Sequence, residues 1–204
     1  MSDALVILLH GVGASGASLA PLGRLWSDSL PGVAFAAPDG AYPFDMGGAG
    51  RQWFSVAGVT PDNRAERIVG ARAALDEVLG GLIAAHDLAD RLERVALVGF
   101  SQGTIMALDA VVSGRWPVGA VVGFSGRLAS PEPWTPSETP VLLVHGDADP
   151  VIPIAEGQAA AAALSEAGAT VEWAAIPGGR HELHPAGAAT AGRFLARRLN
   201  TTPR

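Results

Sequence analysis

The chain of 204 residues contains no cysteine and no lysine. Without cysteine it can form no disulfide, no thiolate nucleophile and no cysteine-bound metal site, and this composition fits a cytoplasmic protein. Without lysine it can carry out no Schiff-base chemistry and cannot form a P-loop. Long apolar runs are also missing: the longest runs, such as Ala4–Leu9, are far shorter than the roughly 20 residues of a membrane-spanning helix.

Positive charge is scarce as well. The net charge is −6, and the 14 basic residues, all of them arginine, form no cluster. We therefore expect neither nucleic acid nor a stable membrane association as a partner. No basic stretch precedes the first apolar run, so we expect no signal peptide and a cytoplasmic location. A hydrophobic content of 49% in a chain of this length predicts a single domain over residues 1–204.

Short apolar runs alternate with helical patterns along the whole chain. The runs end at glycine, proline or a His-Gly pair, which is typical of buried parallel strands. They are Ala4–Leu9, Val33–Ala37, Val95–Val98, Val118–Val122, Val141–Val144 and Thr170–Ile176. Helical stretches are expected over 19–30, from Thr60-Pro61 onward, and over Ser101–Ser113, Ile154–Ala167 and Pro185–Leu199. This alternation predicts an α/β fold with a mostly parallel, doubly wound sheet of about six to seven strands.

One glycine-rich turn carries a nucleophile motif. Gly99-Phe100-Ser101-Gln102-Gly103 matches G-x-S-x-G, directly after a predicted strand and at the start of a predicted helix. Such a turn holds its serine in a strained backbone conformation, and only glycine fits two residues to either side. The helix N-terminus beside the serine favours negative charge that develops there. Ser101 is therefore the predicted nucleophile.

The residues that complete this chemistry follow in the required order. A hydrolase of the α/β type needs an acid after a later strand and a histidine after the last one. Asp147 and Asp149 are the candidate acids, and both follow the run that ends at Val144. His181 follows the last apolar run. All of these positions lie at the edge where parallel strands end, so we expect them to meet Ser101 there.

The chain resembles the phospholipase/carboxylesterase family of α/β-hydrolases, which includes acyl-protein thioesterases. The resemblance rests on Leu8–Gly13, Arg51–Phe54, Gly99–Gly103, His145–Asp149 and His181. It implies that Asp149 is the acid of a Ser101–Asp149–His181 triad and that the backbone amides of Val12 and Gln102 form the oxyanion hole. It also implies an α/β-hydrolase fold and a serine carboxylesterase that needs no cofactor. We expect it to act on a small-molecule ester as a monomer or homodimer.

Aromatic residues on two expected loops indicate the substrate pocket. Trp53 and Phe54 lie within Asp39–Val59, and Trp134 lies within Gly126–Thr139. Aromatic residues above an active edge often form the walls of a pocket. The chain has no insertion long enough for a lid domain, so we expect short- to medium-chain esters as substrates. An acyl-thioesterase or lysophospholipase acting through the same triad is the alternative.

Two other motifs indicate different functions. Gly11, Gly13 and Gly16 form a G-x-G-x-x-G pattern, with Asp39 after the next strand, as in a nucleotide-binding oxidoreductase. The downstream triad residues outweigh this pattern. His181, Glu182 and His184 resemble a metal site but lack a distant third ligand, so we expect no metal.

Overall fold

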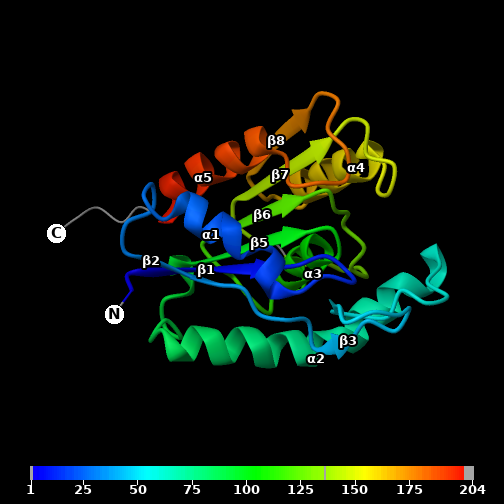
Figure 1. Cartoon of the computed structure of the whole chain (residues 1–204), viewed down its shortest axis with the longest axis horizontal. Coiled ribbons are helices and arrows are strands. Elements are labelled where there is room, and N and C mark those ends of the chain that lie inside the picture. Colours follow the sequence, from blue (N-terminus) through cyan, green and yellow to red (C-terminus); the bar gives the residue numbers. More distant parts are fainter. Residues whose placement is uncertain (1, 136, 200–204) are drawn as a thin grey trace.

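A computed structural model of the chain describes residues 2–135 and 137–199. Its centre is a six-stranded parallel sheet in the order β2-β1-β5-β6-β7-β8 (Figure 1). The strands are β1 (Ala4–Leu9), β2 (Val33–Ala36), β5 (Val95–Phe100), β6 (Ala120–Phe124), β7 (Val141–Gly146) and β8 (Val171–Ile176). All five neighbouring pairs are parallel, so every strand ends at the same edge.

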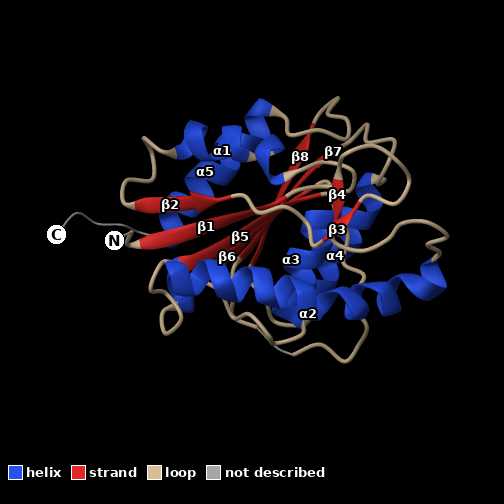
Figure 2. Ribbon diagram, turned by 60° about the horizontal axis from the view of Figure 1, so that its bottom comes forward, coloured by secondary structure: helices blue, strands red, loops and turns tan. Residues whose placement is uncertain are grey.

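Helices cover both faces of this sheet (Figure 2). The helices are α1 (Ala20–Trp26), α2 (Pro61–Ala85), α3 (Gln102–Val112), α4 (Ile154–Glu166) and α5 (Pro185–Leu199), with short 3-10 turns at Gly16–Ser18 and Leu92–Arg94. Helices α2, α3 and α4 pack on one face, whereas α1 and α5 pack on the other. The prediction of a doubly wound, mostly parallel α/β-hydrolase sheet is confirmed.

The central strands are buried because both of their faces are covered. All six residues of β1 are at most 1% exposed. Alternate side chains enter the two cores: Leu5, Ile7 and Leu9 pack with α2 and α3, and Ala4, Val6 and Leu8 pack with α1 and α5. Each large aliphatic side chain so buried stabilises the fold by about 1.5–3 kcal/mol. The unbroken apolar run Ala4–Leu9 therefore corresponds to a strand inside the sheet, between β2 and β5.

Local hydrogen bonds set where α2 and β6 begin. Thr60 caps α2: its hydroxyl accepts from the Asn63 amide at 3.4 Å, and the Asn63 side chain accepts from the Thr60 amide at 2.8 Å. This confirms the predicted start of the helix. Strand β6 begins at Ala120 rather than Val118, because the Val118 amide closes a turn onto the Trp116 carbonyl at 2.8 Å.

Two expectations need correction. The helix expected over residues 19–30 ends at Trp26, and Leu30 reaches the core from a turn in which its amide donates to the Trp26 carbonyl. The segment Asp39–Val59, which was expected to be only a loop, contains a two-stranded antiparallel pair, β3 (Tyr42–Pro43) and β4 (Arg51–Gln52). Among the described residues, neither 37–60 nor 125–140 contains a helix, in agreement with the prediction that no lid domain is present.

Candidate active site

Ser101 lies in a strained turn between β5 and α3. Its φ of 53° and ψ of −113° are unusual for a residue with a side chain. The turn is possible because its neighbours are glycines: a Cβ at Gly103 would overlap the carbonyl of Leu9, and one at Gly99 would overlap the backbone of the following helix. The Ser101 amide donates to the Phe124 carbonyl on β6 at 2.9 Å, which ties the turn to the sheet. The serine side chain therefore stands at the edge where the strands end.

Asp149 follows β7 at the same edge. Its side chain is fully buried, and Oδ1 accepts hydrogen bonds from the amides of Val151 at 2.8 Å and Ile152 at 2.9 Å. Burial alone would raise the pKa of Asp149, but the hydrogen bonds from His181, Ile152 and Val151 outweigh it and hold this pKa below its ordinary value. The carboxylate is therefore ionised at neutral pH.

His181 follows β8 and joins the other two residues. Its Nδ1 donates to Asp149 Oδ2 at 2.8 Å, and its Nε2 lies 3.0 Å from Ser101 Oγ. Because a carboxylate only accepts, Nδ1 carries the proton and Nε2 accepts from the serine hydroxyl. The ring also packs on Phe100, with centroids 5.0 Å apart. The structure thus brings the three predicted residues into one hydrogen-bonded chain.

The rival residues have other partners. Asp147 Oδ1 accepts from the Gly178 amide at 2.7 Å, which links the loops after β7 and β8. His184 Nδ1 accepts from the Ala186 amide at 3.2 Å, beside the start of α5. Within the described part of the chain, no group of three His, Asp or Glu side chains could hold a metal ion. Geometry therefore favours Asp149 over Asp147 as the partner of His181.

The loop after β1 passes directly over the serine turn. A Cβ at Gly11 would lie 3.3 Å from the Ser101 Cβ, so this loop approaches the serine turn closely. The amide of Gly13 donates to the Arg51 carbonyl at 2.9 Å and ties the loop to β4. Gln102 is the first residue of α3, and the amide of a first helical residue has no partner within its helix. The predicted oxyanion residues Val12 and Gln102 thus lie on the two segments that meet at Ser101.

The buried side chain of His10 supports this loop. Its Nδ1 donates to the Gly11 carbonyl at 2.7 Å, and its Nε2 accepts from the Gly40 amide at 2.8 Å. Burial lowers the pKa of His10, because the charged ring would lose its hydration. A neutral ring is also what the two hydrogen bonds require, since a charged imidazole accepts none. His10 therefore fixes the first glycine of the loop.

The dinucleotide-like glycine pattern is used within the fold. The Gly16 amide donates to Asp39 Oδ1 at 2.8 Å, so the acid that would bind a ribose is engaged by the loop itself. A Cβ at Gly16 would overlap the Ala37 carbonyl, and Gly13 has a φ of 77°. Close packing and turn geometry therefore account for both glycines.

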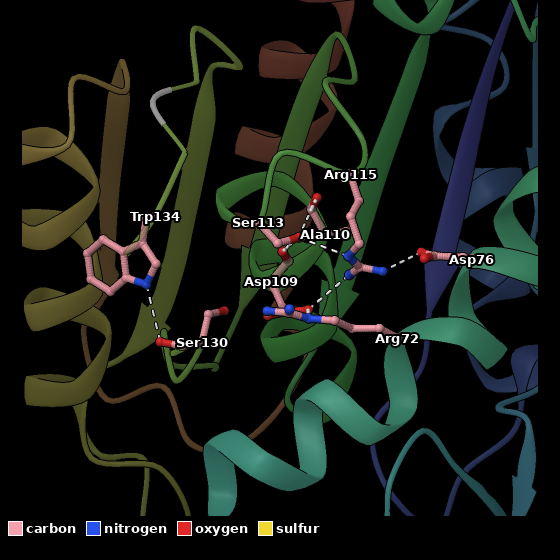
Figure 3. A network of polar contacts seen from close by, with 8 residues as sticks. All are labelled: Arg72, Asp76, Asp109, Ala110, Ser113, Arg115, Ser130 and Trp134. Atoms are coloured by element: carbon pink, nitrogen blue, oxygen red, sulfur yellow. Dashed lines mark hydrogen bonds and ion pairs between the residues drawn. The ribbon is translucent and has the colours of Figure 1, made fainter. Parts of the chain in front are cut away.

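The three predicted pocket aromatics differ in exposure. Trp53 is 1% exposed, and its Nε1 donates to the His10 carbonyl at 2.9 Å. Phe54 is also buried, whereas Trp134 is half-buried and donates to the Ser130 carbonyl at 3.2 Å (Figure 3). A direct contact of Trp53 with substrate stays a prediction, and one that its burial does not favour.

The side chain of Gln102 is a feature that sequence reasoning missed. Its Oε1 accepts from the Trp53 amide at 2.8 Å, and its Nε2 donates to the Phe54 carbonyl at 2.7 Å. One buried amide thus holds the aromatic segment against the residue next to the nucleophile. A glutamine after the nucleophile, together with Gln-Trp-Phe upstream, was the only signal.

Comparison with known proteins agrees with this site. A family model described as phospholipase/carboxylesterase matches residues 1–199. The chain belongs to the phospholipase/carboxylesterase family. It is 35% identical to "Esterase YpfH" of Escherichia coli (strain K12) over 172 residues, which cover 82% of this chain and 71% of that protein. It is 27% identical to "Acyl-protein thioesterase 1" of Gibberella zeae over 213 residues, covering 96% and 91% of the two chains.

A solved structure of a related esterase has the same fold. The crystal structure of esterase PE8 superposes with a TM-score of 0.89 at 33% identity, over 97% of this chain and 94% of that one. As a member of the phospholipase/carboxylesterase family, the chain is a serine hydrolase of carboxylic esters. Of the helices in the described ranges, none is long and apolar enough to cross a membrane.

Proposed function

We propose that Ser101, His181 and Asp149 form the catalytic triad of this carboxylesterase. The observation that carries the proposal is the position of His181, whose two ring nitrogens lie 2.8 Å from Asp149 Oδ2 and 3.0 Å from Ser101 Oγ. The base is thus within reach of the proton that it must remove, and its other nitrogen is oriented by a fixed carboxylate.

The reaction proceeds in two acyl-transfer steps. Ser101 Oγ attacks the ester carbonyl while its proton passes to His181 Nε2, and the alcohol leaves with that proton as the acyl-enzyme forms. A water molecule then gives its proton to the same nitrogen and attacks the acyl carbon, and Ser101 recovers a proton as the acid is released. Asp149 stabilises the charged imidazole in both steps.

The amides of Val12 and Gln102 are the proposed oxyanion donors. The carbonyl oxygen becomes negatively charged when the tetrahedral intermediate forms, and fixed N–H groups stabilise that charge without reorganising. Support comes from the close approach of the Gly11 segment to Ser101, and from the position of Gln102 at the N-terminus of α3.

Short- to medium-chain carboxylic esters are the proposed substrates. Within the described residues the site is bordered by loops without a helical lid, and a site open to water buries a short acyl chain better than a long one. Phe54 and Trp134 are proposed pocket residues. Acyl-thioesters are the alternative substrate class, supported by the similarity to a protein named acyl-protein thioesterase 1. Lysophospholipids are a further alternative, in line with the phospholipase/carboxylesterase description of the family.

The remaining sequence predictions belong to the same proposal. Residues 1–204 form one domain, which works without a cofactor as a monomer or homodimer in the cytoplasm. Residues 1, 136 and 200–204 of that domain lie outside the described residues.

A covalent probe tests the nucleophile. A fluorophosphonate should label the wild-type protein, and Ser101→Ala should abolish both labelling and turnover of p-nitrophenyl esters. Ser125→Ala is a matched control, because Ser125 also follows a strand and has a φ of 46°, but Arg127 stands where the motif requires glycine. Labelling that survives Ser101→Ala and disappears in Ser125→Ala would refute the assignment. Assays on p-nitrophenyl esters and acyl-thioesters with acyl chains of about two to sixteen carbons would identify the preferred substrate class. Each methylene that the pocket buries should strengthen transition-state binding by about 0.8 kcal/mol, so kcat/KM should rise with chain length until the pocket is full.

A further inference from the structure

His145 is a buried histidine for which the proposed mechanism provides no role. It stands near the end of β7, and its side chain is 2% exposed. Its Nε2 lies 2.8 Å from the Ile152 carbonyl and 3.4 Å from Asp149 Oδ2. Both of these groups only accept hydrogen bonds, so Nε2 carries a proton and donates it, principally to Ile152. The ring thus contacts the turn that holds the acid.

Hydrogen bonds from two directions close this turn. The Asp149 carboxylate accepts from the Ile152 amide at 2.9 Å, while His145 donates to the carbonyl of the same residue at 2.8 Å. Asp149 Oδ2, the atom that His145 approaches to 3.4 Å, is also the atom that accepts from His181 at 2.8 Å. A movement of the turn would therefore change the contact between Asp149 and His181 directly.

The His145 ring is itself held by two neighbouring elements. It stacks on Trp173 of β8, with ring centroids 6.3 Å apart and planes inclined by 30°. On α4, a Cβ at Gly157 would lie 2.5 Å from His145 Nδ1, so only a glycine leaves room for the ring at this position. The imidazole is fixed before any substrate binds.

We propose that His145 is a positioning residue, which holds the Asp149 turn at the distance that His181 requires. The inference rests on the proposed triad. Its physical basis is that the charged form of His181 gains most from a carboxylate held in one place, because a preorganised charge does not have to reorient during the reaction. His145 itself contacts neither substrate nor the reacting atoms.

The charged groups of the neighbouring elements have partners of their own. In the described part of the chain, Asp149 and His181 are titratable side chains with contacts at the turn. From α4, Glu156 is engaged by Arg127 at 3.3 Å, and from the β7 loop Asp147 accepts from the Gly178 amide. A change in the pH profile after substitution of His145 would therefore report on Asp149 and His181.

Substitution of His145 by residues with and without a donor tests the proposal. His145→Leu removes the donor and should lower kcat by about 10- to 100-fold with little change in KM, since small misplacements of catalytic groups cost this much. The acid side of the kcat/KM profile should move to lower pH by about half a unit, because the charged imidazole loses part of its stabilisation. His145→Gln places an amide N–H near the position of Nε2 and should restore most of kcat and the pH profile.

Two further variants separate positioning from stability. Gly157→Ala keeps the histidine but displaces its ring, and should lower kcat and shift the profile in the same direction, even if His145→Leu fails to fold. Leu79→Ala removes a fully buried side chain on α2 and should lower the melting temperature without moving the profile. If His145→Leu and Gly157→Ala lower the melting temperature without moving the pH profile, as Leu79→Ala should, or if they move the profile to higher pH, the proposal is wrong. Failure of the triad itself would instead appear as activity retained in Ser101→Ala.

Discussion

Within the described part of the chain, two aspartates have fully buried side chains and differ in what surrounds them. Asp149 accepts from two backbone amides and from His181, none of which carries a permanent charge. Asp109, in the middle of α3, lies between two arginines: Arg72 binds both of its oxygens at 2.8 and 3.0 Å, and Arg115 binds one at 2.9 Å (Figure 3). Both carboxylates are satisfied, but only Asp109 is neutralised by fixed cations.

This difference separates a catalytic from a structural carboxylate. The arginines hold Asp109 in place, and because they stay charged, the ion pair does not depend on a proton gained or lost by the cations. Around Asp149 the compensating charge is absent at rest and appears only when His181 takes up a proton. The buried carboxylate of Asp149 can therefore stabilise the step in which His181 becomes positively charged.

The Asp109 cluster also joins helices that pack on the same face of the sheet. Arg72 belongs to α2, and Arg115 follows the end of α3 and also pairs with Asp76 of α2. The Trp116 indole donates to Asp76 at 2.6 Å. The cluster therefore fixes α3, whose first residue follows Ser101, against α2.

Asp149→Asn should have the largest effect on catalysis. The asparagine can still accept the two backbone amides, but it presents an uncharged group to His181 and favours the wrong tautomer. We expect kcat to fall by about 10³- to 10⁴-fold, with a small change in urea stability. A loss of activity below tenfold would mean that Asp149 is not the acid.

Asp109→Asn should lower stability strongly and kcat little, the reverse of Asp149→Asn. The substitution removes the carboxylate that Arg72 and Arg115 share, so both arginines lose this counter-ion. Breaking a buried ion pair costs about 3–5 kcal/mol of stability. Urea unfolding should show this loss, while kcat per folded molecule stays within a few-fold of the wild type. A severe loss of kcat in a protein of normal stability would contradict the structural role.

The sequence predicted the Asp149 site far better than the Asp109 cluster. In a parallel sheet, every loop that follows a strand reaches one edge, so the order of Ser101, the two candidate acids and His181 in the chain predicted that these side chains meet there. The choice of Asp149 over Asp147 came from the family resemblance. Gly99 and Gly103 marked the strained turn, because a side chain at either position would overlap neighbouring backbone atoms. Asp109 and Arg72 come from different helices, and no short motif links them; a single charge inside the apolar stretch Gln102–Val112 was the only signal.

Loop aromatics show a second limit of sequence reasoning. Trp53 and Phe54 were predicted to line a pocket because they are aromatic residues on an expected loop above the active edge. The structure buries both, and the side chain of Gln102 binds the Trp53 amide and the Phe54 carbonyl. A side-chain amide that pairs with a distant backbone leaves no periodic pattern, so sequence could not distinguish an exposed wall from a buried anchor.

Acid should weaken the wild type more than Asp149→Asn. The pKa of Asp149 lies below its ordinary value in the folded state. The ionised form therefore stabilises the fold above the unfolded pKa of about 3.9, and this contribution disappears as the pH falls through the folded pKa. In urea titrations, the difference in unfolding free energy between the two proteins should be constant above about pH 5 and should change below about pH 4. A difference that is independent of pH down to acid denaturation would show that the carboxylate charge adds nothing to stability.

Asp147→Asn should have the smallest effect, although only one residue separates it from Asp149. The Asp147 carboxylate accepts from the Gly178 amide at 2.7 Å, and Oδ1 of an asparagine can accept the same bond. The loops after β7 and β8 should therefore keep their positions, and His181 should keep its distance from Asp149. Removal of one charge from this exposed side chain should change the electrostatic surroundings of His181 little, because water screens exposed charges. We expect kcat/KM within about threefold of the wild type, measured beside Asp149→Asn on the same p-nitrophenyl ester. If Asp147→Asn were the more damaging of the two, the acid of the triad would be Asp147, and the contrast between Asp149 and Asp109 would no longer separate catalysis from structure.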